Sequence, residues 1–97
     1  MEIQRFEVAF ELAWKTLRDY LEHLGHNVSP SPRPVIKEAF AAKVLIDGQV
    51  FIDMLEARNT MAHIYDEETF GKIFVDIKEQ FEPALQSLCE FLRSEIA

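Results

Sequence analysis

Three polar side chains and a tyrosine lie close together in one short segment, where they could act on a phosphodiester. Residues 58–66 read Arg-Asn-Thr-Met-Ala-His-Ile-Tyr-Asp and include Arg58, Asn59, His63 and Tyr65. A guanidinium binds phosphate in a fork geometry, and an imidazole titrates near neutral pH and can carry a proton. In metal-free RNA cleavage, one group takes the 2′-hydroxyl proton and another stabilises the charge that develops on phosphorus. An Arg/His pair therefore meets the minimum requirement for this chemistry.

The spacing of this pair leaves two interpretations open. On an ideal helix, residues five apart lie about 140° around the axis. Arg58 and His63 would then diverge, unless the helix unwinds near His63 or a second subunit supplies the partner across a two-fold axis. The alternative is structural, because Arg and His complement the dipole at a helix C-terminus and Tyr65 can pack at the following turn. Asp53 and Glu56 are expected to hold the Arg58 guanidinium or to lie on a solvated face.

Other kinds of site are missing from the sequence. It contains no Gly-rich phosphate loop, no Cys pair for zinc and no His-Glu-Xaa-Xaa-His motif. The three histidines show no ligand spacing, so we expect neither a metal nor a cofactor. The single Cys89 fits a reducing compartment, and the chain shows neither a signal peptide nor an apolar run long enough to span a bilayer. We therefore expect a cytoplasmic protein with no membrane partner.

The charge is unevenly distributed along the chain. Residues 1–45 contain six Lys/Arg and six Asp/Glu, whereas residues 46–97 contain four and eleven, which gives net charges of 0 and −7. This balance excludes a uniformly basic surface for nucleic acid. Any RNA contact would need a local patch, for which the candidates are Lys15, Arg18, Arg33, Lys37, Lys43 and Arg58.

The elements that must position these residues are helices. Apolar residues in the first 24 positions alternate spacings of three and four, which is typical of the packing face of a bundle helix. We predict a helix from about residue 2 to 24 that ends at Gly25. Additional apolar residues widen its stripe, which is a first indication of an oligomer. The stripe contains Ile3, Phe6, Phe10, Ala13, Leu17, Tyr20 and Leu24, and it is widened by Ala9, Trp14 and Leu21.

Two further helices are predicted in the middle of the chain. Residues 29–34 contain three prolines and form an ordered connector, since proline lacks an amide hydrogen and restricts the residue before it. A second helix covers about residues 33–44, and a third begins after the Asp47–Gly48 turn and ends near His63. The residues of the second helix and its end that we expect to face the core are Val35, Ile36, Ala39, Phe40 and Leu45.

A fourth helix is predicted from about Asp66 to the C-terminus. Pro83 should kink or split it, because proline removes the hydrogen bond to the carbonyl of Glu79. Its helical stripe consists of Phe70, Phe74, Ile77, Phe81, Leu85, Leu88 and Leu92. No segment shows the two-residue period of a strand, so the sequence predicts a single all-α domain over residues 1–97, a bundle of about four helices.

Four blocks of the sequence resemble the HEPN superfamily, and in particular its nucleotidyltransferase substrate-binding proteins. These blocks cover most of the chain in the expected order and are much more specific than Arg-Xaa4-His alone. They are Ile3-Gln4-Arg5-Phe6 with Phe10-Glu11-Leu12-Ala13-Trp14-Lys15, Ser31-Pro32-Arg33 with Ile36-Lys37-Glu38-Ala39-Phe40, Ile46-Asp47, and Arg58-Asn59 through His63-Ile64-Tyr65-Asp66.

The resemblance implies an antiparallel, up-and-down four-helix bundle that forms a homodimer and pairs with a minimal nucleotidyltransferase. In such pairs the HEPN subunit looks like a toxin with metal-independent endoribonuclease activity, and the nucleotidyltransferase looks like its antitoxin. Arg58 and His63 match the catalytic Arg and His, and Asn59 matches the polar residue after that Arg. Tyr65 resembles the acceptor onto which the partner transfers AMP. An added nucleotide would place bulk and negative charge beside the site and block RNA.

Two departures from the family pattern bear on this hypothesis. Family members usually have another amphipathic helix before the Gln-Arg-Phe block, so this bundle would lack the family's first helix, and a dimer partner would fill the groove or the fold would be less stable. The acidic second half weakens affinity for RNA and suits a basic partner. The alternatives to a ribonuclease are therefore a non-catalytic subunit that binds substrate or nucleotide for the nucleotidyltransferase, and a purely structural assembly module.

Overall fold

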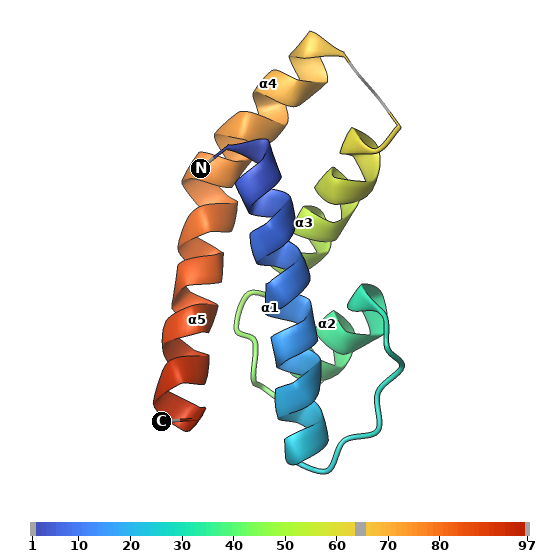
Figure 1. Cartoon of the computed structure of the whole chain (residues 1–97), viewed down its shortest axis with the longest axis vertical. Helices are drawn as coiled ribbons and strands as arrows, with labels where there is room; N and C mark the ends of the chain where they lie inside the picture. Colours follow the sequence, from blue (N-terminus) through green and yellow to red (C-terminus); the bar gives the residue numbers. More distant parts are fainter. Residues whose placement is uncertain (1, 64–65, 97) are drawn as a thin grey trace.

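The chain folds into four helical segments packed along one long axis (Figure 1). The structure is a computed structural model that describes residues 2–63 and 66–96. The segments are α1 (Ile3–His23), α2 (Pro32–Ala41), α3 (Gly48–Met61) and a continuous bent rod made of α4 (Glu67–Asp76), the π-helical η1 (Ile77–Phe81) and α5 (Glu82–Ile96). In Figure 1, α3 runs opposite to α1 and to the rod. No strand occurs among the described residues, which confirms the all-α bundle.

Helix α1 follows the predicted period closely and ends where glycine allows it to end. Gly25 adopts a φ of +96°, a left-handed conformation that costs glycine little. The amide of His26 then donates to the carbonyl of Leu21 at 2.9 Å, which satisfies one of the last free carbonyls of the helix. The apolar period of α1 therefore sets its packing face, and Gly25 sets its length.

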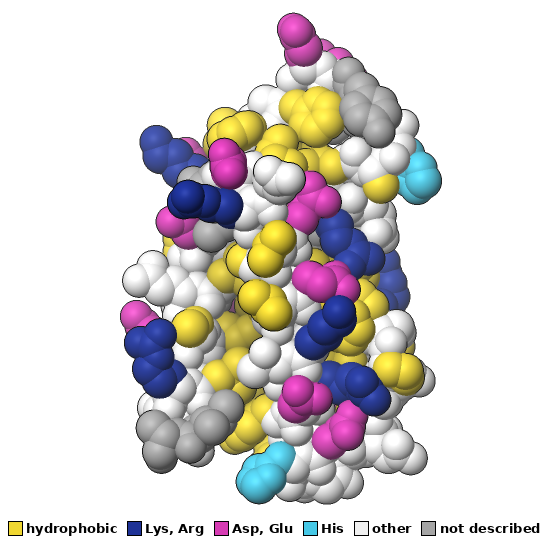
Figure 2. Space-filling model, in the orientation of Figure 1, with side chains coloured by type: hydrophobic (Ala, Val, Ile, Leu, Met, Phe, Trp, Pro, Cys, Tyr) yellow, Lys and Arg dark blue, Asp and Glu magenta, His cyan; other side chains and the backbone are white. Residues whose placement is uncertain are grey.

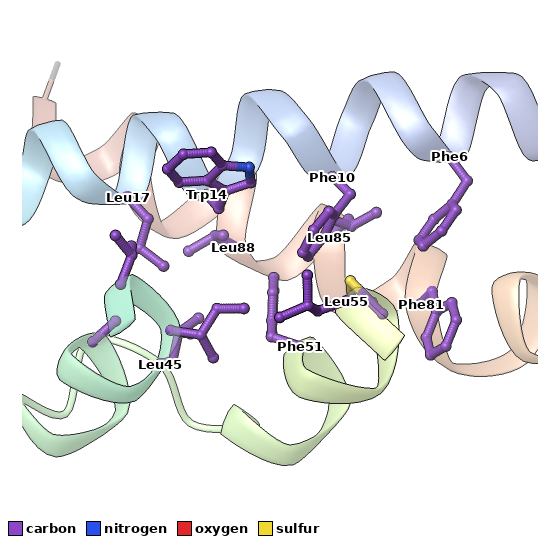
Figure 3. Close-up of a cluster of buried hydrophobic side chains, with 14 of the residues drawn as sticks. Phe6, Phe10, Trp14, Leu17, Leu45, Phe51, Leu55, Phe81, Leu85 and Leu88 are labelled. Atoms are coloured by element: carbon purple, nitrogen blue, oxygen red, sulfur yellow. The ribbon is translucent and has the colours of Figure 1, made fainter. Parts of the chain in front are cut away.

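The core lies between α1 and the other three segments, and Figure 3 shows side chains of α1 directed toward the others. At one end of the core, the Phe6 ring stacks on Phe81 with centroids 5.3 Å apart and on Phe10 at 6.2 Å. Burying a side chain of this size stabilises the fold by about 1.5–3 kcal/mol relative to leaving it exposed. The fully buried large side chains are Phe6, Phe10, Phe81, Leu17, Leu21, Ile36, Met54, Ile77 and Val35.

The predicted disturbance at Pro83 takes the form of a π-helical segment. The amide of Glu82 donates to the carbonyl of Ile77, five residues back instead of four. This accommodates one extra residue in the turn before Pro83, which has no amide hydrogen to donate. Ile77, Phe81 and Leu85 are all buried despite the change in helical period. The rod thus bends without losing its contact with the core.

Three residues that the periodicity assigned to the packing face are exposed instead. Leu24 is 50% exposed because it lies beyond the end of α1, and Phe40 is 55% exposed with its ring against Gly48. Phe74 is 47% exposed because α4 extends past the other helices, and Ile73 is its only buried residue. The predictions for these three were wrong, since a helical period identifies a face but not whether a neighbour covers it.

Candidate functional site at the end of α3

The polar segment predicted to carry chemistry lies where α3 changes into a turn. The helix ends at Met61, and the next two amides bond three residues back: Ala62 to Asn59 at 3.2 Å, and His63 to Thr60 at 3.0 Å. Such bonds tighten the last turn of a helix. His63 therefore follows the helix rather than lying on it, so the 140° separation of an ideal helix does not apply to it.

Arg58 is bound by a carboxylate from α1. Its Nη1 donates to Oε2 of Glu11 at 2.9 Å, and its Cζ lies 5.7 Å from the centroid of the Phe10 ring. The Arg58 and Glu11 side chains are 29% and 39% exposed, so the pair lies at the rim of the bundle. Of the two alternatives for Asp53 and Glu56, the contact with this guanidinium was wrong, because both lie on the side of α3 that faces α4, where Glu56 is exposed and Asp53 partly exposed.

Glu11 connects Arg58 to two further groups. Its Oε2 also accepts a hydrogen bond from Nε1 of Trp14 at 3.2 Å, and its Oε1 lies 3.4 Å from Nζ of Lys15. Partial burial raises the pKa of Glu11, but the hydrogen bonds from Trp14 and Lys15 and the charges of Lys15 and Arg58 outweigh this, so its pKa is below its usual value. Glu11 is thus held as a carboxylate that fixes one edge of the Arg58 guanidinium.

Glu11 is the site residue that the functional motif alone did not reveal. It lies 47 residues from Arg58 in the chain, on another helix. One signal was present in the sequence, because Glu11 stands between the buried aromatic residues Phe10 and Trp14 and belongs to a block that carries the family resemblance. A charged residue adjoining a buried stripe can reach a partner on the neighbouring helix.

The other predicted site residues are placed differently. Asn59 and His63 are exposed, and Tyr65 lies outside the described residues. Within residues 2–63 and 66–96, no hydrogen bond or ion pair joins the side chains of Arg58, Asn59 and His63. The structure thus brings Arg58 to α1 and leaves His63 open to solvent at the end of α3.

Three of the six residues of the candidate basic patch for RNA are paired with carboxylates. Lys15 and Arg58 share Glu11, and Nε of Arg18 lies 2.9 Å from Oε1 of Glu22. On the face of the molecule shown in Figure 2, basic and acidic side chains are interspersed. Bound carboxylates reduce the positive field that would attract a polyanion.

A cleft of about 860 Å³ separates α3 from α4 and is strongly acidic. Arg58, Asn59 and His63 do not line it, whereas Asp66, the residue that precedes α4, does. Asp66 caps α4 by accepting a bond from the amide of Glu68 at 3.2 Å. The charged residues that line the cleft are Asp53, Glu56, Asp66, Glu68 and Asp76, with Lys72 as the one cation among the described lining residues.

Comparison with protein families decides the relationship that the sequence blocks suggested. The model of the family "Nucleotidyltransferase substrate binding protein like" matches residues 2–94. The chain belongs to this family. The nucleotidyltransferase substrate-binding proteins belong to the HEPN-like fold group, in agreement with the all-α bundle. No curated protein matched the chain in a sequence search.

Within the described part of this family member, no group of three or more His, Cys, Asp or Glu side chains could hold a metal ion. None of the helices described for it is both long enough and apolar enough to cross a bilayer.

Proposed function

We propose that this protein is the HEPN-type partner subunit of a minimal nucleotidyltransferase and acts as a metal-independent endoribonuclease. The observation that carries the proposal is the placement of Arg58: Glu11 holds its guanidinium at the rim of the bundle, five residues before an exposed imidazole. Membership of the nucleotidyltransferase substrate-binding family supports the pairing.

In this proposal each group has a distinct role. His63 accepts the proton of the 2′-hydroxyl as that oxygen bonds to phosphorus, and Arg58 stabilises the negative charge that grows on the phosphate. The bond from phosphorus to the 5′ oxygen breaks, and that oxygen takes up a proton from water, which leaves a 2′,3′-cyclic phosphate and a 5′-hydroxyl. A guanidinium has five N–H donors, so the bond from Nη1 to Glu11 leaves others for a phosphate. Asn59 contributes a polar contact beside them. A second copy of the chain completes the site, because Arg58 and His63 of one copy make no contact with each other.

Cleavage of RNA in EDTA tests the catalytic role. His63→Ala should abolish cleavage without lowering the melting temperature, since its side chain is exposed. Arg58→Lys should reduce cleavage strongly, because an ammonium keeps the charge and loses the fork geometry. His23→Ala removes another exposed histidine and should leave cleavage unchanged. Equal cleavage by the wild-type and His63→Ala proteins would refute the ribonuclease.

Silencing by the partner is part of the same proposal. Transfer of AMP from ATP to the hydroxyl of Tyr65, with release of pyrophosphate, would add a negative charge and bulk two residues from His63 and so exclude RNA. Mass spectrometry after incubation with the nucleotidyltransferase and ATP should show an added AMP, which Tyr65→Phe prevents. An unmodified wild-type protein, or AMP still added to the Tyr65→Phe variant, would remove Tyr65 from the mechanism.

The acidic cleft favours a second candidate, a non-catalytic subunit that binds its partner or a nucleotide substrate for it. Five carboxylates face one lysine across the described lining of the cleft, which repels RNA and suits a basic protein surface. Calorimetry with the nucleotidyltransferase should then show saturable binding in the absence of any RNA cleavage. Glu68→Lys should weaken that binding, whereas Glu95→Lys on the exposed end of α5 should not.

A further inference from the structure

One face of helix α2 combines two cations with an exposed aromatic ring. Arg33 and Lys37 are exposed, and Phe40 is 55% exposed although its side chain is large and apolar. Their spacings of four and three residues place the three side chains on one side of the helix, and we call them the α2 face. The residues of α2 that face the core instead are Val35, Ile36 and Ala39.

The α2 face keeps its positive charge. Within residues 2–63 and 66–96, no carboxylate forms an ion pair with Arg33 or Lys37. The only acidic residue of α2 is Glu38, which lies about 100° around the helix from Lys37. Its Oε1 is 3.8 Å from Nδ1 of His26, in the connector before α2. In a chain with a net charge of −7, two cations without a carboxylate partner suit an anionic ligand.

The Phe40 ring is held in place by the beginning of α3. A methyl group at Gly48 would lie 2.7 Å from Cδ1 and 2.8 Å from Cγ of Phe40, so the ring can take this position only because Gly48 has no side chain. The ring is thus fixed along one edge, while the Phe40 side chain as a whole remains exposed. A base can stack on a ring that is already fixed with little further loss of side-chain entropy.

A second exposed phenylalanine shows what is specific to the α2 face. Phe74 on α4 is 47% exposed, close to the value for Phe40. Seven residues before Phe74 stands Glu67, whereas Arg33 stands seven residues before Phe40. No cation occupies the position three residues before Phe74. The ring of Phe74 therefore lacks the cations that accompany the ring of Phe40, and it provides a matched control.

We propose that the α2 face binds single-stranded RNA, with one base stacked on Phe40 and the adjoining phosphates bound by Lys37 and Arg33. This rests on the proposed function, in which RNA is the substrate. Stacking on a side chain needs an unpaired base that can leave its neighbours, whereas cations bind the phosphates of any sequence. The α2 face therefore selects single strands and not a particular sequence. An acidic protein surface would be attracted by the same cations without needing the ring, so the contribution of Phe40 distinguishes the two ligands.

Helix α3 connects the α2 face with the candidate site. The Phe40 ring lies against Gly48, the first residue of α3, and His63 follows Met61, its last residue. The 14 residues of α3 rise about 20 Å, so one RNA strand must span roughly this distance to contact both places. A stacked strand rises about 3.4 Å per nucleotide, which places about six nucleotides between the stacked base and the cleaved bond. A dinucleotide is too short to contact both.

Fluorescence anisotropy with a labelled oligouridylate of about twelve nucleotides tests the stacking. The His63→Ala protein in EDTA is the parent, so that the RNA stays intact. Phe40→Ala should weaken binding about fivefold or more, the loss of one stacked base, whereas Phe40→Tyr keeps a ring and should bind like the parent. Phe74→Ala should also leave the affinity unchanged. A parent that binds no RNA, or equal affinities of the parent and Phe40→Ala, overturns the proposal.

Two further sets of variants test the position of the ring and the phosphate contacts. Gly48→Ala retains Phe40 but displaces its ring, so it should weaken RNA binding with an unchanged helical circular-dichroism spectrum. Lys37→Gln and Arg33→Gln should each reduce the slope of log K against log salt concentration by about 0.7. Lys78→Gln, at an exposed lysine of η1, should not change the slope. Unchanged slopes for Lys37→Gln and Arg33→Gln overturn the phosphate contacts.

Cleavage kinetics separate a failure of this inference from a failure of the proposed function. In a protein with His63 intact, Phe40→Ala should raise KM for the long RNA and leave kcat unchanged, because Phe40 is far from the reacting atoms. Cleavage of a dinucleotide should not respond to Phe40→Ala. RNA that binds through the α2 face but is not cleaved by the wild-type protein refutes the ribonuclease and supports this inference. Cleavage of the long RNA with the same KM in both proteins overturns this inference and leaves the ribonuclease standing.

Discussion

Replacing Glu11 with Gln tests the most specific contact in the structure. Glutamine has nearly the same shape and keeps one oxygen that can accept a hydrogen bond, but it removes the negative charge. The change therefore weakens the bonds from Arg58 and Trp14 and the ion pair with Lys15 without creating a cavity. Helix α1 and the core behind it should keep their packing.

The size of the effect follows from the exposure of the partners. An exposed ion pair contributes about 0.2–1 kcal/mol, and a hydrogen bond to a charged group contributes about 1.5–3 kcal/mol when it is buried. The side chains of Glu11 and Arg58 are 39% and 29% exposed, and that of Lys15 is 58% exposed. These contacts are therefore closer to an exposed ion pair than to a buried hydrogen bond. We therefore expect Glu11→Gln to lower the free energy of unfolding by about 1 kcal/mol, which lowers Tm by roughly 4–8 °C in a domain of this size.

The effect should depend on pH in one direction. The pKa of Glu11 is lower in the folded protein than its usual value, so the unfolded chain binds more protons as the pH falls. The stabilisation by this carboxylate is complete above the unfolded pKa of about 4.3 and is lost as the pH falls through the lower folded pKa. The Tm difference between the wild-type and Glu11→Gln proteins should be constant from pH 6 to 8 and should shrink below about pH 4.

A double-mutant cycle measured by thermal and urea unfolding isolates the pair. Arg58→Met keeps an apolar stem over the Phe10 ring and removes the charge. Combined with Glu11→Gln, it should give a coupling free energy of about 0.5–1 kcal/mol. Additive effects of the two substitutions, or a Tm difference that persists unchanged at pH 3, would refute the claim that Glu11 and Arg58 act as a pair.

Substitutions at three further positions test the fold. Phe6→Ala should cost about 3–5 kcal/mol in urea unfolding, because Phe6 is fully buried and stacked on Phe81; a loss below 1 kcal/mol would contradict this packing. Asp66→Ala removes the cap of α4 and should cost about 0.5–2 kcal/mol, whereas Asp66→Asn should retain most of the stability. Lys43 has a φ of +62°, so Lys43→Gly should stabilise the protein by about 0.5–1 kcal/mol and raise Tm, while Lys43→Ala should not.

The sequence by itself determined the helices and most of their boundaries. Three kinds of signal fixed these elements: the three- and four-residue spacing in α1, the glycine after its end, and the proline in the rod of α4, η1 and α5. Each signal affects only neighbouring residues, through backbone hydrogen bonds or through the side-chain period of the helix. The family blocks likewise identified the segment around Arg58, and the match over residues 2–94 confirmed the family. Because these signals are local, they can be recognised before the chain is folded.

Only the tertiary structure decided which groups meet. Asp53 and Glu56 are near Arg58 in the sequence, yet Glu11 binds it, because α1 packs against the face of α3 from which Arg58 extends. Similarly, Phe74 keeps the helical period but remains exposed, because the end of α4 extends beyond its neighbours. A contact between helices depends on their relative position and rotation, which are set by the packing of the whole core and not by the spacing within one helix.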